Sequence, residues 1–436
     1  MITIKEVKTR KQQAEFVDFP TKLYNNNKYY VHPLRIDEIN LFNRKKNVYY
    51  EDCDAVFYLA YKDDKIVGRI AGILQRLYND KTKEKRVRFT RFDSTNDEEV
   101  ATALFNAVEN WAKQKGMNKV HGPLGFNDLD REGLLIEGFD YIATFEEQYN
   151  YNYYQKLIEK CGYQKEIDWL EYRIYPPKEI SERVQRLSDT VLKRYNLKVV
   201  NEKNKNEYLK KYKKGIFEVL DEAYSSLYGV VPFNDRLRDQ IVSQFKLFIK
   251  LRYVITIVDE NDEVVAFGFA IPSLSEAVQK SKGRFFPFGF IRMLKAINET
   301  KYADLGLIAV KTEYQSKGLL AVVLNYVINN MIKHNLEYCE TNLMLEDNLR
   351  IQQTWNNFEH IQHKRRRSFI KNLDKLAENK NENTVLTKSA KKPATIAKKT
   401  QVRKTEKTSE QKPIKKTENK AVKATTKKTT IKKPIK

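Results

Sequence analysis

Cysteine and histidine are scarce in this chain. Its 436 residues include three cysteines, Cys53, Cys161 and Cys339, and five histidines. The cysteines are odd in number and far apart, which argues against a disulfide framework and fits a reducing compartment. No histidine has a pair of cysteines beside it, and His360 and His363 form only a loose i, i+3 pair. We therefore expect no metal site.

Long apolar runs are also missing. No stretch approaches the roughly 18 apolar residues that a membrane-spanning helix needs. The first residues, MITIKEVKTRKQQ, carry charges where a signal peptide needs an apolar centre. The sequence therefore predicts a cytoplasmic protein, at most peripheral at the inner face of the membrane.

Acidic and aromatic residues become sparse at the C-terminal end. From Lys375 onward the chain has 20 Lys and Arg, 5 Asp and Glu, and no aromatic residue. Such a segment has too little apolar surface to offset its chain entropy, so residues 375–436 are predicted to be a disordered, Lys-rich tail. The charge predicts non-specific contact with nucleic acid or with an anionic membrane. A role in solubility alone is the alternative.

The first 374 residues repeat one order of elements. Each half runs through helices, a hairpin, a strand, a helix, a strand, a helix and a final strand. The hairpins are expected at residues 56–74 and 253–271, where apolar and polar residues alternate on both sides of an acidic turn. The pattern predicts an α/β (α+β) protein with mixed central sheets flanked by helices. Its domains are expected at residues 1–178 and 179–374, and the repeated order indicates duplication.

One segment suggests a binding site for an anion. Residues 303–310 have the composition of a strand, Gln315 to Gly318 form a polar turn, and residues 319–332 form an apolar helix. A helix that begins at such a turn directs free backbone N–H groups and the positive end of its dipole at an anion. A plain strand-to-helix turn is the alternative.

The chain resembles the GNAT superfamily of N-acetyltransferases, in which a Q/R-x-x-G-x-G/A loop holds the pyrophosphate of coenzyme A. Gln315 and Gly318 match that loop, whereas Leu320 stands at its third position. The chain looks most like bacterial double-domain acyltransferase-like proteins, a group that includes bacterial ceramide synthases. The segments that carry this resemblance are residues 122–126, 133–140, 153–154, 161–163 and 345–348.

The resemblance implies an acyl donor, acyl-CoA or acetyl-CoA, and a primary amine as acceptor, which is a sphingoid-type lipid amine in the ceramide synthases. The second half is the better donor site, because the first half places Asp97, Glu98 and Glu99 where a pyrophosphate would be repelled. The first half is therefore expected to be degenerate. The donor contacts are expected at Ile308, Val310, Gln315, Ser316, Lys317, Gly318, Leu319 and Asn348.

The catalytic residues are less well defined. The superfamily often places a Tyr acid seven residues after the Asn that opens the next helix, but that position here is Trp355. Tyr314 is a substitute for it. Asp304 and Glu340 lie on neighbouring strands and are candidates for the general base. Either carboxylate fits equally well as a solvated strand residue.

Two further segments allow opposite interpretations. Glu137, Asp140, Tyr149 and Tyr153 are candidates to bind the acceptor amine in a cleft between the halves, or they belong to a loop that locks the halves together. The Phe-rich residues 284–295, with basic flanks, suit an anionic bilayer or a long acyl chain, but burial under a domain interface explains them as well.

Two functions of different class follow. The first is an acyl-CoA-dependent N-acyltransferase. The second, which Trp355 and Leu320 favour, is a catalytically inactive binding protein of the same fold, tethered to nucleic acid or membrane by its tail.

Overall fold

The computed structural model describes residues 1–45 and 47–374, and these residues all lie in one compact unit. The predicted tail, residues 375–436, lies outside the described residues. Within the described ranges, no helix is long and apolar enough to cross a bilayer.

Across the described ranges, fourteen strands form one mixed sheet. Twelve of them follow the order β1-β2-β3-β4-β5-β14-β7-β12-β11-β10-β9-β8, while the short strands β6 and β13 pair with β14 and β7. The first half supplies β1 (Ile2–Glu6), β2 (Cys53–Lys62), β3 (Lys65–Gln75), β4 (Arg86–Ser94), β5 (Lys119–Gly122), β6 (Leu134–Glu137) and β7 (Gln164–Tyr175). The second half supplies β8 (Lys198–Val199), β9 (Val254–Val258), β10 (Val264–Pro272), β11 (Tyr302–Val310), β12 (Tyr338–Glu340), β13 (Met344–Leu345) and β14 (Glu359–Asn372).

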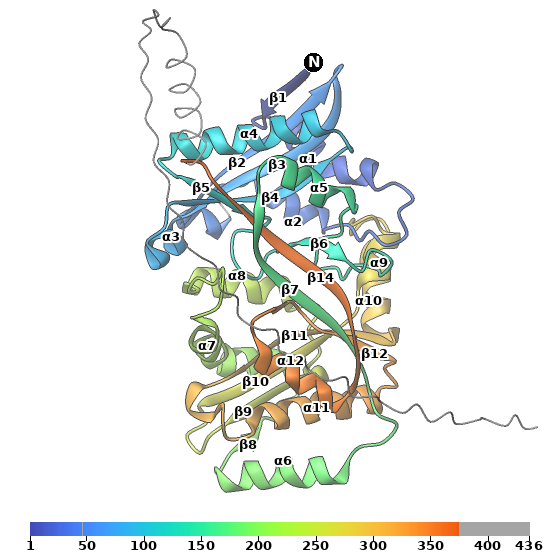
Figure 1. Ribbon diagram of the computed structural model, residues 1–436. Helices are drawn as coiled ribbons and strands as arrows, with labels where there is room; N and C mark the ends of the chain where they lie inside the picture. Colours follow the sequence, from blue (N-terminus) through green and yellow to red (C-terminus); the bar gives the residue numbers. More distant parts are fainter. Residues whose placement is uncertain (46, 375–436) are drawn as a thin grey trace, which may run out of the picture. The chain divides into compact units, whose positions relative to one another are not determined.

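The two central strands are exchanged between the halves. β7 comes from the first half but pairs with β12, and β14 comes from the second half but pairs with β5. The two strands also pair with each other, from Glu359↔Tyr175 to Ile370↔Gln164, and Figure 1 shows them side by side through the centre of the sheet. Each half of the chain therefore completes its part of the sheet with a strand from the other half.

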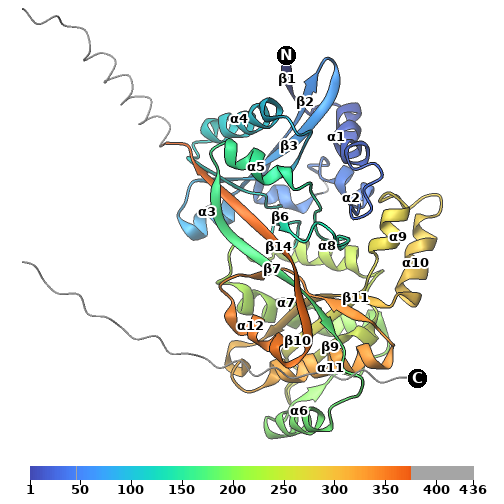
Figure 2. The same cartoon turned by 45° about the vertical axis from the view of Figure 1, so that its right-hand side comes forward.

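Matching helices flank this sheet, which confirms the mixed α/β class (Figure 2). α4 forms because Asp97 caps its first turn and Val100, Leu104 and Val108 form one apolar face that packs on the core. α11 follows β11 as α4 follows β4. The α-helices of the first half are α1 (Arg10–Leu23), α2 (Arg35–Asn40), α3 (Arg76–Thr82), α4 (Glu98–Gln114) and α5 (Tyr153–Lys160). Those of the second half are α6 (Glu182–Arg194), α7 (Lys205–Tyr224), α8 (Asp235–Phe245), α9 (Ser275–Lys280), α10 (Gly289–Glu299), α11 (Leu319–Lys333) and α12 (Leu349–Thr354). Short 3-10 helices are η1 (Val48–Glu51), η2 (Leu251–Tyr253), η3 (Thr312–Tyr314) and η4 (Trp355–Asn357).

Candidate acyl-CoA and amine site

The strands β11 and β12 diverge after three paired residues. Their parallel pairing runs from Tyr302↔Tyr338 to Asp304↔Glu340. Thr341 then bonds to β7, because its N–H donates to the Tyr172 carbonyl at 2.8 Å and its hydroxyl accepts from the Tyr172 N–H at 2.9 Å. Among the described strands, none covers the β12-facing edge of residues 305–310. An open edge inside a sheet offers backbone donors and acceptors to an extended ligand.

A cavity of about 450 Å³ occupies this opening. One wall consists of Leu305 to Val310 of β11, and another consists of Thr341 to Leu345. Apolar side chains from α7, α8 and η2 extend the cavity away from the strands, among them Leu209, Ile216, Leu220, Ala223, Ile241 and Leu251. The cavity therefore has an apolar interior with the dimensions of a small-molecule site.

The loop before α11 borders one side of this cavity. Gly318 has a φ of 86°, a conformation that glycine adopts without strain, and no side chain caps the helix that follows it. Gln315 and Leu320 line the cavity, and so does Arg350. The Arg350 guanidinium donates to the Gln315 side-chain oxygen at 3.3 Å and to its backbone carbonyl. The uncapped helix terminus and this guanidinium together can hold a phosphate.

The other predicted loop residues lie elsewhere. Ser316 is exposed, and the Leu319 side chain is buried in the core beneath α11. The Lys317 ammonium lies over the rings of Tyr314 and Tyr195, at 4.4 and 5.1 Å from their centroids. The cation that lines the cavity beside this loop is thus Arg350 of α12 and not Lys317, and the sequence pattern did not indicate Arg350.

The predicted contacts on the strands and on α12 do line the cavity. Ile308 and Val310 contribute to its wall, and so does Asn348, whose side chain accepts from the Ile351 N–H at 3.5 Å at the start of α12. Trp355 also lines the cavity, but its indole N–H donates to the Met344 sulfur at 3.2 Å. Tyr314 is half-buried and lies outside the lining.

Five acidic residues line the end of the cavity that the first half supplies: Asp128, Asp130, Glu132, Glu146 and Glu147. Burial raises the pKa of Asp128 to about 6, that of Glu146 to about 7 and that of Glu147 to about 8. Burial, together with the charge of Asp128, raises the pKa of Glu132 well above its usual range.

Three of these carboxyl groups have an oxygen that lacks a hydrogen-bond partner within the described part of the chain: Asp128 Oδ1, Glu132 Oε1 and Glu147 Oε2. Buried acceptors without donors are costly. An ammonium group has three N–H donors and a positive charge. It can therefore donate to the carboxyl oxygens that lack a donor and offset the negative charge of the neighbouring carboxylates.

Asp304 and Glu340 lie where the strands diverge. Burial, together with the charge of Glu340, raises the pKa of Asp304 well above its usual range, and Asp304 Oδ2 accepts no hydrogen bond from the described residues. Burial would also raise the pKa of Glu340, but Lys364 and His363 outweigh it and hold that pKa below its usual range. The ionised form is therefore favoured at Glu340 and the protonated form at Asp304, and neither residue lines the cavity.

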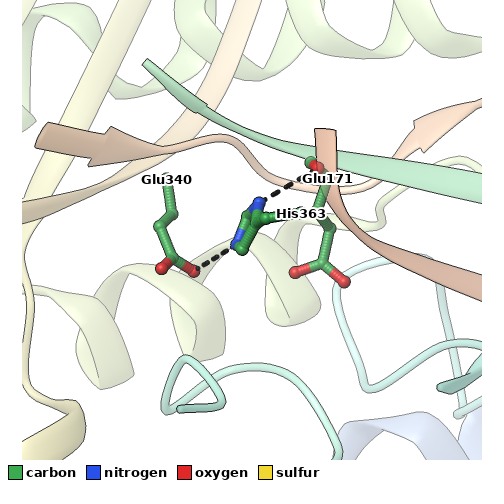
Figure 3. A group of neighbouring side chains, drawn as sticks. All are labelled: Glu171, Glu340 and His363. Carbon is green, nitrogen blue, oxygen red and sulfur yellow. Dashed lines mark hydrogen bonds and ion pairs between the residues drawn. The ribbon is translucent and has the colours of Figure 1, made fainter. Parts of the chain in front are cut away.

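Figure 3 shows Glu340 with Glu171 and His363, whose candidate ligand atoms lie within 4.8 Å of one another. Cations of the protein already pair with both carboxylates. The Lys364 ammonium lies 2.8 Å from Glu340 Oε2 and 3.7 Å from Glu171 Oε2, and Arg366 Nε donates to Glu171 Oε1 at 2.6 Å. A metal ion would have to displace Lys364, so this group is better explained as a buried ion-pair network.

The four residues predicted to bind the acceptor lie outside the cavity lining. Glu137 and Asp140 are exposed, and Arg365 Nε lies 3.1 Å from Glu137 Oε1. The hydroxyls of Tyr149 and Tyr153 donate to the backbone carbonyls of Phe139 and Ser94. These contacts fit the alternative in which the four residues belong to a loop that locks the halves together. The carboxylates that do reach the cavity come from the same region of the chain, but no local pattern distinguished them.

The corresponding opening in the first half is filled by the protein itself. β4 and β5 also pair over three residues and then separate. Beyond them, Arg91 Nη2 lies 3.1 Å from Glu38 Oε1 and 3.2 Å from Asp130 Oδ1, and all three groups are largely buried. The Ser94 N–H donates to the Tyr154 hydroxyl at 3.1 Å. In the described part of the first half, these side chains thus occupy the region beyond the paired residues of β4 and β5.

Comparison with known proteins identifies the fold. No family model matches the chain. A GCN5-related glucosamine N-acetyltransferase region of a fungal multi-domain GH3 β-N-acetylglucosaminidase superposes with a TM-score of 0.51 and 11% identity, over 85% of this chain and 38% of that one. The chain has the fold of the GCN5-related N-acetyltransferases. This finding confirms the resemblance predicted from the sequence, at the level of fold.

Two curated proteins are related in sequence. Protein YghO of Escherichia coli (strain K12) is 28% identical over 280 residues, which are 64% of this chain and 70% of that protein. The bacterial ceramide synthase of Caulobacter vibrioides (strain NA1000 / CB15N) is 25% identical over 321 residues, which are 71% of this chain and 80% of that protein.

Proposed function

We propose that the chain is an N-acyltransferase that moves an acyl group from acyl-CoA to a primary amine. The proposal rests on the groups that line or border one cavity. It brings together an uncapped helix N-terminus, the open edge of β11 and a cluster of carboxyl groups with raised pKa values. Phosphate, an extended pantetheine chain and an amine each match one of these features.

The acyl donor would bind to residues of the second half of the chain. The pyrophosphate of CoA would bind at the N-terminus of α11 beside Gln315 and Arg350. The pantetheine amides would bond to the β12-facing edge of β11 at Ile308 and Val310, whose carbonyls accept from the Tyr224 hydroxyl at 3.0 Å and the Gln315 amide at 3.4 Å in this structure. The thioester would then lie near Asp304 and Glu340, where the strands diverge.

The acceptor amine would bind to residues of the first half of the chain. An alkylammonium would bind the carboxylates of Glu146 and Glu147, and one of them would take its proton. The amine nitrogen then attacks the thioester carbonyl, a C–N bond forms, the C–S bond breaks and the nitrogen releases a second proton as it becomes an amide. The departing thiolate takes up a proton, for which Asp304, whose pKa burial raises well above its usual range, is our candidate donor, and the proton from the nitrogen restores the Asp304 carboxyl group. Trp355 cannot supply one, because its indole N–H donates hydrogen bonds but does not ionise.

The finer substrate class is a long-chain acyl group and a sphingoid-type amine. Two observations support it: the apolar extension of the cavity between α7, α8 and η2, and the similarity to a bacterial ceramide synthase. A polar acceptor would leave these apolar side chains exposed to water.

Calorimetric titration of the full chain with CoA, acetyl-CoA and palmitoyl-CoA tests the proposal. We expect palmitoyl-CoA to bind most tightly, and we expect Gly318→Glu to weaken binding of all three by about 100-fold, because a carboxylate at a helix N-terminus repels phosphate. Gly116→Glu is the matched control. Gly116 also has a positive φ, 72°, with open space around its Cα, but it lies at the end of α4 in the first repeat.

Turnover is measured with the same donors and a sphingoid amine, by following thiol release. CoA binding without thiol release from any amine would favour the catalytically inactive binding protein. Absence of CoA binding, or unchanged affinity in Gly318→Glu, would contradict the site described above.

A further inference from the structure

The segment between β10 and β11 leaves the sheet and exposes an aromatic surface. It contains α9, a loop and α10, which lie at the right-hand edge of Figures 1 and 2. Phe286 is 84% exposed, Ile291 62% and Phe288 61%. Phe290 and Leu294 are also exposed. Five large apolar side chains from one short segment thus face solvent, and burial under a domain interface does not account for them.

The segment is anchored by a different set of residues. Met293 and Ile297 of α10 are buried in the core of the first half, and Phe285 packs against the same core. Gly283 and Gly289 hold the loop close to its neighbours, because a side chain at either position would overlap a backbone carbonyl. The exposed residues therefore lie on a segment that is anchored to the core. We name their surface the Phe patch: Phe286, Phe288, Phe290, Ile291 and Leu294.

The charge within the segment that carries the Phe patch has one sign. Residues 280–295 contain five cations and no Asp or Glu: Lys280, Lys282, Arg284, Arg292 and Lys295. Acidic residues outside the segment pair with three of them, namely Glu276 with Lys280, Glu299 with Lys295 and Asp18 with Arg284, at 3.1, 3.6 and 3.7 Å, and ion pairs at such solvent-accessible positions contribute little. The patch is therefore apolar in the centre and basic at its rim.

We propose that the Phe patch docks the protein on an anionic lipid bilayer. Aromatic and aliphatic side chains would enter the boundary between headgroups and acyl chains, while the cations contact lipid phosphates. Charge complementarity selects this partner over a second copy of the chain, because two patches face to face would bring ten cations together. The patch residues lie apart from the cavity lining, so this inference does not rest on the proposed acyl transfer.

Vesicle co-sedimentation of the full chain tests the inference. The vesicles are phosphatidylcholine alone and phosphatidylcholine with about 30% phosphatidylglycerol. The Lys-rich tail could bind such vesicles by charge alone, so binding is also measured at about 0.5 M NaCl, where the Debye length falls to roughly 4 Å. Apolar insertion should persist there, whereas purely electrostatic binding should not.

The variant Phe286→Asp/Phe288→Asp should lose at least about tenfold in affinity for the mixed vesicles at both salt concentrations. Leu187→Asp is the matched control, since Leu187 of α6 is a similarly exposed apolar residue, 55%, outside the patch. A fluorophore on Phe288→Cys should shift to the blue with vesicles, and the same label on Leu187→Cys should not. Both proteins keep the same native cysteines.

Three results would overturn the inference. The first is equal binding of the parent and the Phe286→Asp/Phe288→Asp variant. The second is failure of the parent to bind mixed vesicles at low salt. The third is a parent dimer that the variant abolishes without any change in vesicle binding, which would assign the patch to self-association.

Discussion

Asp304 and Glu340 occupy the last paired position of β11 and β12, yet their carboxyl groups have opposite pKa shifts. The difference comes from Lys364, whose ammonium lies 2.8 Å from Glu340 Oε2. Arg173 also donates to Glu340, at 2.6 Å to Oε1. Both cations belong to the two central strands, because Lys364 lies on β14 and Arg173 lies on β7.

Removing Lys364 should destabilise the fold. Lys364→Met leaves buried Glu340 with less compensation, and breaking a buried ion pair typically costs about 3–5 kcal/mol. Chemical denaturation of the full chain would measure this loss. Lys301→Met removes the exposed partner of Glu337, at 3.0 Å, and should leave the free energy of unfolding almost unchanged. Equal effects of the two substitutions would show that Lys364 does not neutralise Glu340.

The acidic end of the cavity should make stability depend on pH. Burial raises the pKa of Glu147 to about 8, whereas an unfolded Glu has a pKa of about 4.3. The folded state holds the proton more tightly, so the resulting stability is fully present below about pH 4 and is lost as pH rises through about 8. Between the two pKa values the stability falls by about 1.4 kcal/mol for each pH unit, so the part of the loss between pH 6 and about 8 lies within a measurable range.

Thermal or urea unfolding between pH 6 and 9 would show this loss, and Glu147→Gln should reduce it. Glu313→Gln, at an exposed position, should leave the pH dependence of the parent intact. A flat profile in the parent protein would mean that Glu147 is not buried as described.

The same acids should control acyl transfer. If Glu146 or Glu147 takes the proton of the amine, the rate rises as pH increases through about 7–8, where these groups ionise. Glu146→Gln/Glu147→Gln should lower kcat by about 10²–10⁴-fold with little change in the KM for acyl-CoA. Tyr314→Phe, outside the cavity, should change kcat little. A larger effect of Tyr314→Phe would return the acid role to that residue.

The apolar extension of the cavity should determine which acyl chains fit. Ala223→Phe adds a ring to the wall formed by α7, which should weaken palmitoyl-CoA binding by at least about tenfold while acetyl-CoA binding stays the same. Calorimetry with both donors would measure the ratio of affinities. A parallel loss for both donors would indicate a distorted cavity rather than a shortened one.

The sequence was sufficient where the signal is local. Alternating apolar residues predicted the hairpins at 56–74 and 253–271, which the structure has as β2–β3 and β9–β10. Gly318 marked the turn before α11, because a positive φ favours glycine. These features depend on neighbours in the chain, so composition and spacing are enough to find them.

The segment at 338–345 illustrates the limit. The structure divides it into β12 and β13, because Thr341 bonds to Tyr172 of β7 and carries the chain away from β11. That interruption opens the cavity. No residue near Thr341 in the sequence indicates the interruption, since its partner Tyr172 lies 169 positions away.

The sequence by itself determined the order of elements in the hairpins, the glycine turn before α11 and the basic, Phe-rich segment. Only the tertiary structure decided that β7 and β14 are exchanged, that Glu146 and Glu147 of one repeat face β11 of the other, and that the Phe patch is exposed. The physical reason is that repeat order, turns and amphipathic faces are encoded by near neighbours. The pKa and exposure of a side chain depend instead on groups that only the folded chain brings within a few ångströms.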